Sequence, residues 1–219
     1  MPHGIEKQEL EKLEQLIETS STLHVNDVLF RQGEPFSKLW AVKSGTFKST
    51  RLDESGNEHV VGFHLPGELM GLDGIYPETY STTVTALDSA VLCAMDYTEL
   101  KALCVDIPAL QNQLLRLLSR DIYESHRLNA ETADFSAPQK LAGFLNNLSM
   151  RYEARGYSAT TFKLAMSRQD IASHLGITPE TVSRILKQFR QQALIDIDNR
   201  FVNIKRANEL DTLISCSHR

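Results

Sequence analysis

Cysteine is scarce in this 219-residue sequence, with three residues at the widely separated positions 93, 104 and 216. They form no CxxC pair and no disulfide framework, which argues against a small disulfide-rich fold. The sequence also has no run of 18 or more apolar residues, so no membrane-spanning helix is predicted. Residues 1–18 lack the basic and apolar regions of a signal peptide. We therefore expect a cytoplasmic protein without a membrane partner.

Basic residues are scarce in the first part of the chain. Residues 1–135 carry 11 Lys or Arg against 21 Asp or Glu, whereas residues 136–219 carry 12 against 7. A polyanion such as DNA repels the first part and attracts the second. Many domains reach this positive charge without contacting nucleic acid, so a motif has to decide the function.

Short apolar segments alternate with turn residues in the first part. Residues 5–18 have leucines at positions 10, 13 and 16, the spacing of an amphipathic helix. From residue 22 to 95 the pattern changes to short strands, and the predicted strands include residues 39–42, 46–52, 59–64, 82–87 and 90–95. Short strands at nearly regular spacing predict an antiparallel barrel or jelly roll.

A long helix is predicted from Asp106, a plausible N-cap, with Pro108 in its first turn. It carries a stripe at the 3,4,3,4 spacing of a coiled coil, formed by Leu115, Leu118, Ile122, Ser125 and Asn129. The stripe has two interpretations, a core helix packed on its own barrel or the seam of a homodimer. The spacing favours the seam, and the charged residues that flank the stripe indicate that the rest of the helix is solvated.

After the long helix, residues 135–138 form a predicted break, and the helix that follows it ends at Gly156. The pattern of residues 167–189 then predicts two short helices joined by a turn. Ser167 caps the first helix, and Gly176 ends it and forms the turn. Thr178 caps the second helix, with Pro179 at its first position. This pattern is typical of a helix-turn-helix, whose second helix enters the major groove of DNA.

The second helix has two distinct faces. Its apolar stripe consists of Val182, Ile185, Leu186 and Phe189, and its outward side chains are Glu180, Thr181, Ser183, Arg184 and Lys187. Arginine binds guanine through two hydrogen bonds, and glutamate accepts a hydrogen bond from the cytosine amino group. The alternative, a helical hairpin with a solvated face, does not explain the double capping. The alternating segments 194–197 and 201–204 predict a β-hairpin, which makes the unit a winged helix.

Several segments resemble the CRP/FNR family, which includes the cyclic AMP receptor protein and the fumarate-and-nitrate-reduction regulators. The resemblance covers nearly the whole chain and lies in residues 30–34, 42–45, 67–71, the long helix and residues 166–189. Residues 62–73 and the E-x-x-S-R segment at 180–184 are similar to the FNR branch. The resemblance implies an α+β protein with a cyclic-nucleotide-binding-type jelly-roll barrel at 1–105, a dimerisation helix at 106–135 and a winged helix-turn-helix at 136–219.

The resemblance also implies site residues and partners. Glu180, Ser183 and Arg184 match the positions that read bases. The positions that contact or support phosphates are matched by Ser167, Arg168, Gln169, Thr178, Thr181 and Lys187. It implies a homodimer on a TTGAT–N4–ATCAA palindrome, and activation through contacts of exposed barrel loops such as 53–57 with RNA polymerase.

Two departures from the family concern the signal. The cyclic AMP branch holds the nucleotide phosphate with an Arg-Ser pair, but residues 77–84 contain no arginine and carry Glu78. The FNR branch holds an iron–sulfur cluster with N-terminal cysteines and one barrel cysteine; only Cys93 has a match here, and one thiolate does not hold such a cluster. Cys93 is interpreted as a small buried residue on a strand. We therefore expect no cofactor, neither a cluster nor cyclic AMP.

Three alternatives remain. A metal enzyme on the jelly roll would use His24, His59 and His64, but His59 and His64 lie five apart on one strand and face opposite sides. No nucleophile, base and orienting group can be assembled, so no enzyme is expected. A cyclic-nucleotide module that regulates another protein conflicts with the helix-turn-helix. A haem-sensing member of the family, with a barrel histidine as ligand, stays open, and an absorbance spectrum would distinguish it.

Overall fold

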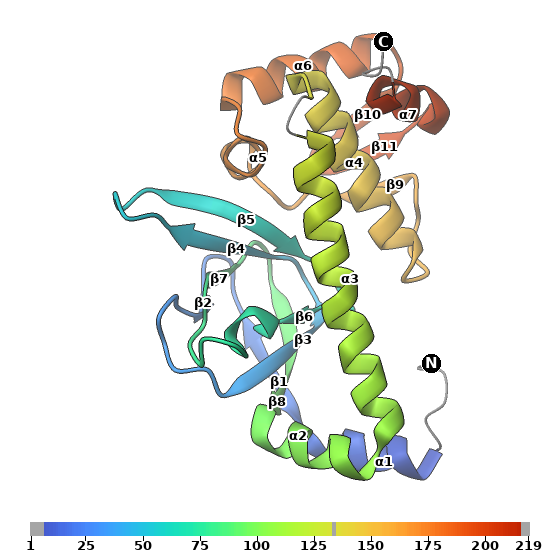
Figure 1. The fold of residues 1–219 in the computed structure, drawn as a ribbon. Helices are drawn as coiled ribbons and strands as arrows, with labels where there is room; N and C mark the ends of the chain where they lie inside the picture. The colour runs from blue at the N-terminus through green and yellow to red at the C-terminus, as the bar shows by residue number, and fades with distance from the viewer. Residues whose placement is uncertain (1–6, 133–134, 216–219) are drawn as a thin grey trace. The chain divides into compact units, whose positions relative to one another are not determined.

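The computed structural model describes residues 7–132 and 135–215. The chain divides into two units, residues 1–55 with 63–129 and residues 56–62 with 130–219 (Figure 1). The first unit contains most of the long helix and the barrel except for residues 56–62, and the second contains those residues and the helix-turn-helix. Each unit is described by itself.

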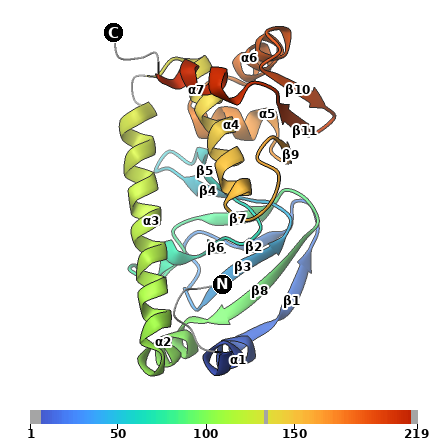
Figure 2. The same cartoon turned by 90° about the vertical axis from the view of Figure 1, so that its right-hand side faces the viewer.

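The barrel consists of two four-stranded antiparallel sheets, with strand orders β1-β8-β3-β6 and β2-β7-β4-β5 (Figure 2). Its strands are β1 (Ile17–Leu23), β2 (Val28–Phe30), β3 (Lys38–Ser44), β4 (Phe47–Leu52), β5 (Glu58–His64), β6 (Leu69–Met70), β7 (Thr83–Ala86) and β8 (Ala90–Asp96). Helix α1 (Lys7–Leu16) precedes them, and a short 3-10 helix η1 (Leu72–Gly74) lies between β6 and β7. All five predicted strands are present, and the prediction of a jelly roll is confirmed.

The barrel interior is filled by apolar side chains from both sheets. Its buried cluster consists of Phe30, Val42, Phe47, Met70, Tyr80, Val84, Ala86, Ala90 and Leu92. Along β8 the inward side chains Ala90 and Leu92 are buried, while Cys93 points the other way and is half-buried. The prediction that Cys93 lies on a strand is confirmed. Its side chain is half-buried and not fully buried as predicted, because alternation along a strand does not by itself show which face points inward.

Helix α2 (Tyr97–Asp106) was not predicted. The Asp96 carboxylate caps it by accepting hydrogen bonds from the backbone N–H groups of Thr98, at 2.8 Å, and Glu99, at 3.1 Å. Asp106 is therefore the last residue of α2 and not the N-cap of the long helix. The long helix α3 (Pro108–Thr132) begins after Ile107, whose backbone leaves the helical conformation between the two.

Helix α3 exposes most of the predicted stripe within the single chain. Leu115 and Ile122 are 56% and 58% exposed, Leu118 is half-buried and Ser125 is exposed. The side chain of Asn129 lies outside the described ones. Large apolar side chains rarely stay this accessible along one helix face unless another surface covers them.

The second unit is a winged helix. It contains α4 (Ala137–Glu153), β9 (Thr161–Lys163), α5 (Arg168–Leu175), α6 (Pro179–Gln191), β10 (Ile195–Asp198), β11 (Phe201–Ile204) and α7 (Ala207–Ser215), with a three-stranded sheet in the order β10-β11-β9. Its fully buried side chains include Leu141, Leu145, Leu148, Ile171, Ile185 and Phe189. The core therefore joins α4 to both helices of the helix-turn-helix.

Leu145→Ala tests the role of this core. Leu145 is completely buried on α4, so the substitution is expected to lower the free energy of unfolding by about 2–5 kcal/mol. Met150→Ala on the same helix is the matched control, because Met150 is 44% exposed and should cost far less. Thermal or urea unfolding of the two variants makes the comparison. Equal losses would contradict the assignment of α4 as the core helix.

Candidate nucleic-acid interface

The first helix of the motif, α5, is fixed by a reciprocal capping box. The Ser167 hydroxyl accepts a hydrogen bond from the Asp170 N–H at 3.0 Å, and the Asp170 carboxylate accepts from the Ser167 N–H at 3.0 Å. The same carboxylate accepts from the Ser167 hydroxyl at 2.6 Å. Asp170 is buried, so these bonds satisfy a charge that would otherwise be costly to desolvate. The box fixes where the helix begins.

The turn between the helices depends on Gly176. Its φ is +64°, in the left-handed region, where a side chain would strain the backbone. The second helix, α6, then begins at Pro179, and the Thr178 hydroxyl caps it by accepting from the Thr181 N–H at 3.3 Å. The predicted turn and both caps are confirmed.

Helix α6 separates its faces cleanly. Val182, Ile185, Leu186 and Phe189 are at most 3% exposed, which fixes the helix against the core. Glu180, Ser183, Arg184 and Lys187 are exposed on the other side, and Thr181 is half-buried. Residues 180 and 184, and likewise 183 and 187, lie four apart and therefore share a face. The predicted base readers are thus presented together at the N-terminal end of α6.

The hydroxyl side chains of the motif form hydrogen bonds within it. The Ser183 hydroxyl donates to the Pro179 carbonyl at 3.0 Å, which leaves its lone pairs as acceptors. The hydroxyl of Thr178 donates to that of Thr181 at 3.1 Å, and Ser167 is held by Asp170. Ser167 thus supports the start of α5, and Thr178 and Thr181 support the start of α6. The exposed Gln169 leaves its amide accessible.

Two ionisable groups of α5 are partly removed from water. Burial lowers the pKa of the Arg168 guanidinium, which remains charged at neutral pH. Burial also lowers the pKa of His174, and the charge of Arg151 lowers it further. The His174 ring lies 5.8 Å from that of Phe144. His174 is therefore neutral near pH 7 and adds nothing to the positive charge of this unit.

The two halves of the chain match known domains. Residues 139–213 match the model of the Crp-like helix-turn-helix domain, and residues 21–106 match that of the cyclic nucleotide-binding domain. The transcriptional activator protein anr of Pseudomonas aeruginosa is 38% identical over 213 residues, covering 97% of this chain and 87% of the relative. The chain belongs to the CRP/FNR family of transcription regulators.

Further matches agree with this family. The transcriptional activator protein FnrA of Stutzerimonas stutzeri is 36% identical over 217 residues, covering 99% of this chain and 87% of the relative. The structure of FixK2 from Bradyrhizobium japonicum has the same fold, with a TM-score of 0.78 and 24% identity over 89% of this chain and 96% of that one. As a CRP/FNR protein, the chain is a DNA-binding regulator and not an enzyme, as the sequence predicted.

An aromatic side chain from the segment at residues 77–84 lies in the buried interior of the barrel. Tyr80 is 5% exposed, and its ring stacks on Phe30 with centroids 3.9 Å apart. Its hydroxyl donates to the Lys38 carbonyl at 2.9 Å and accepts from the Trp40 indole N–H at 3.4 Å. Glu78, two residues before Tyr80, has a φ of +55° and adds a carboxylate to the segment at residues 77–84. Residues 77–84, all of which the structure describes, include this carboxylate and no Lys or Arg.

The cysteines and histidines of the barrel unit lie in separate environments. Cys93 is half-buried and Cys104 is buried, and burial raises the pKa of the Cys104 thiol; Cys216 lies outside the described residues. His64 shares a 2.6 Å hydrogen bond with the Ser49 hydroxyl, whereas His24 and His59 are exposed. Among the described residues, no group of three His, Cys, Asp or Glu side chains is placed to hold a metal ion.

No helix within residues 7–132 and 135–215 combines the length and apolar character that a bilayer crossing requires.

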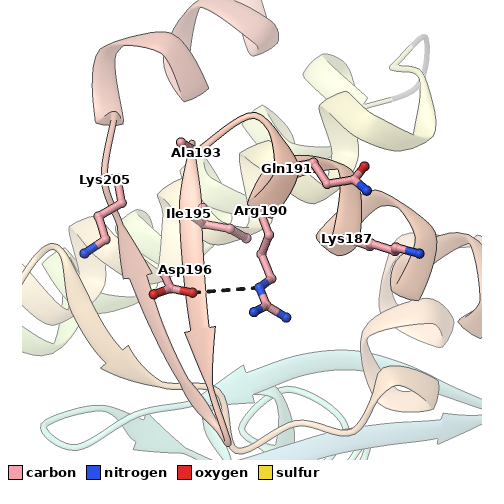
Figure 3. A pocket seen from close by; sticks show the side chains of 7 residues that line it. All are labelled: Lys187, Arg190, Gln191, Ala193, Ile195, Asp196 and Lys205. Carbon is pink, nitrogen blue, oxygen red and sulfur yellow. Dashed lines mark ion pairs between the residues drawn. The ribbon is translucent and has the colours of Figure 1, made fainter.

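One feature of the DNA-binding unit was not predicted from the sequence. Arg190 and Lys205 lie with Lys187 around a shallow pocket at the far end of α6 (Figure 3). Arg190 follows Lys187 at helical spacing, but Lys205 joins it only through the strand pairing, which no short motif encodes.

Proposed function

We propose that this protein is a homodimeric transcription activator that binds a TTGAT–N4–ATCAA palindrome. The supporting observation is the single exposed face at the start of α6 that carries Glu180, Ser183 and Arg184. A recognition helix contacts base edges with its N-terminal residues. Arg184 is the group for the guanine of TTGAT, and Glu180 accepts from the cytosine amino group of the paired base. Ser183 contributes the hydroxyl acceptor between them.

Helix α3 supports the proposed dimer. Leu115 and Ile122 are more than half exposed in the single chain, and Leu118 and Ser125 lie on the same stripe. Pairing two α3 helices covers this apolar surface, at about 25 cal/mol per Å² of area removed from water. A two-fold dimer presents two copies of α6, which matches an inverted repeat with half-sites about one helical turn apart.

The activating role is proposed from two observations. The matched relatives anr and FnrA are named transcriptional activators. The turn at residues 53–57 between β4 and β5 is exposed and presents Asp53 and Glu54. We assign this turn as the contact with RNA polymerase.

Substitution of Asp53 and Glu54 by Ala is therefore expected to reduce transcription without changing DNA affinity.

The spacing of the half-sites tests the proposed function. Purified protein is titrated with a duplex that carries TTGAT–N4–ATCAA and with one whose spacer has five extra base pairs. Those base pairs rotate one half-site to the opposite side of the duplex, so a rigid two-fold dimer loses one of its two sites. Affinity for the longer spacer should fall to that for a single half-site. Equal affinity for both duplexes would contradict a two-fold dimer on a palindrome.

We also propose that the barrel does not use cyclic AMP. A bound phosphate needs a cationic or hydrogen-bonding partner, and the segment 77–84 supplies Glu78 instead. Tyr80 fills the adjoining interior. Calorimetric titration with cyclic AMP is expected to show no heat of binding at micromolar ligand, and DNA affinity should not change. A dissociation constant in the micromolar range would refute this part of the proposal.

A further inference from the structure

Two adjacent side chains of α5 bind the backbone of one strand residue, Val60. Val60 lies on β5, the last strand of its sheet, and it belongs to the same unit as the helix-turn-helix. A residue of an antiparallel strand directs its N–H and C=O groups to the same side. The Val60 N–H donates to the Ser173 hydroxyl at 3.0 Å, and the Val60 carbonyl lies 3.4 Å from the His174 Nδ1. We call these two contacts the β5 clasp.

The second contact fixes the form of the His174 imidazole. A carbonyl oxygen only accepts hydrogen bonds, so Nδ1 carries the proton and donates. In the neutral ring Nε2 then has no proton, and a charged ring would carry one there. Burial lowers the pKa of His174, and its hydrogen bond to Val60 only partly offsets this. The clasp therefore favours the neutral ring.

The surroundings of His174 also disfavour a positive charge. Its ring lies 5.8 Å from that of Phe144 on α4, and the like charge of Arg151 on the same helix lowers its pKa further. Helix α6 packs on α5 as well, with an apolar inner face. The other ionisable side chains that flank the clasp along α5 and β5 are Asp170, which accepts from Ser167, and the exposed Glu58 and His59.

We propose that Ser173 and His174 position the recognition motif by holding α5 on β5, and that a proton on His174 releases this contact and weakens DNA binding at acidic pH. The inference rests on the proposed DNA-binding function and adds a proton-dependent control to it. Because α5 packs directly on α6, a shift of α5 changes where α6 presents Arg184. The two side chains are positioning residues, since they act on DNA through α6.

The direction of the pH effect follows from the proton balance of the two states. A ring released into water titrates near its ordinary pKa of about 6.5, whereas the ring in the clasp has a lower pKa. Above this pH both states are neutral and the clasp is fully formed. As the pH falls below it, the released ring takes up a proton first, so the equilibrium shifts toward release. Protonation of exposed histidines has the opposite effect, because added positive charge attracts DNA.

DNA-binding titrations between about pH 7.5 and about pH 5.5, at constant salt, test the proposal with the full-length protein. Wild-type affinity for the palindrome should fall about threefold to tenfold over this range. His174→Asn keeps an N–H donor near the position of Nδ1 but takes up no proton, so its affinity should not fall. The matched control is His24→Gln, since His24 is exposed and its loss should leave the decline unchanged. A wild type that does not weaken, or a His174→Asn protein that weakens equally, would overturn the proposal.

Hydrogen exchange of the Val60 amide measures the clasp without DNA. Its N–H donates to Ser173, so it should be protected at neutral pH and should lose protection at about pH 5.5 in the wild type but not in His174→Asn. Ser173→Ala removes the acceptor, and it should lower both this protection and DNA affinity at neutral pH. Equal protection in the three proteins at both pH values would refute the clasp. A wild type that loses protection at acidic pH but has no preference for the palindrome would support the clasp and reject the proposed sequence specificity.

Discussion

Arg184→Ala is expected to abolish the preference for the guanine of the TTGAT half-site. Arg184 is exposed at the N-terminal end of α6, where its guanidinium can donate two hydrogen bonds to the O6 and N7 atoms of guanine. Loss of this pair should reduce discrimination by about 1–3 kcal/mol, or about 5- to 150-fold in relative affinity. The measurement is a titration of duplexes that carry G or A at this position. Undiminished discrimination by the variant would remove Arg184 from the base readers.

Lys187→Ala is the control for this experiment. Lys187 lies one turn further along the same face of α6, and it is also exposed. A lysine that contacts phosphate contributes to all sequences equally, so its loss should weaken binding to both duplexes by the same factor and lower the salt slope by about 1. The pair of variants thus separates recognition of a base from attraction to the backbone. Neither substitution touches the buried stripe, so both variants should unfold at the wild-type temperature.

Ser125→Asp is expected to convert the proposed dimer to monomers. Ser125 lies on the α3 stripe, so the proposed seam brings it opposite its counterpart in the second copy. A hydroxyl pair there can share a hydrogen bond, whereas two carboxylates would be desolvated next to each other. This repulsion should raise the dimer dissociation constant by about 100-fold or more, which corresponds to several kcal/mol. DNA affinity should fall with it, because a monomer binds one half-site.

The design of this experiment separates dimerisation from folding. Ser125 is exposed in the single chain, so the substitution should not lower the stability of the barrel unit. Ser125→Ala should leave both the dimer and DNA affinity nearly unchanged, because it adds no charge. Analytical ultracentrifugation at micromolar protein gives the oligomeric state of all three proteins. A Ser125→Asp protein that sediments as the wild type does would place the dimer seam elsewhere.

The elements with a local signal could be predicted from the sequence. Ser167, Gly176 and Thr178 each act within a few residues, through caps and a left-handed turn, and the structure contains all three features. The strands of the barrel follow from alternation and turn residues in the same way. These features depend on backbone conformations and hydrogen bonds that short segments determine by themselves.

Features that depend on long-range pairing could not be predicted. Asp106 has a residue type and a following proline that suit an N-cap, but α2 already includes it, because Asp96 caps an earlier helix start. Tyr80 reaches the barrel interior only through contacts with Phe30 and Lys38, which are 50 and 42 residues away in sequence. Lys205 likewise reaches the end of α6 through the wing. No periodic pattern within one segment encodes such contacts.

Selection of duplexes from a random pool tests the central claim most directly. The wild-type protein should enrich an inverted repeat of TTGAT with four intervening base pairs, because two copies of α6 related by a two-fold axis read the same bases in opposite orientation. The guanine should be the most strongly selected position, and selection with Arg184→Ala should lose it. An enriched motif without two-fold symmetry, or one unrelated to TTGAT, would contradict the assignment of both the dimer and the base readers.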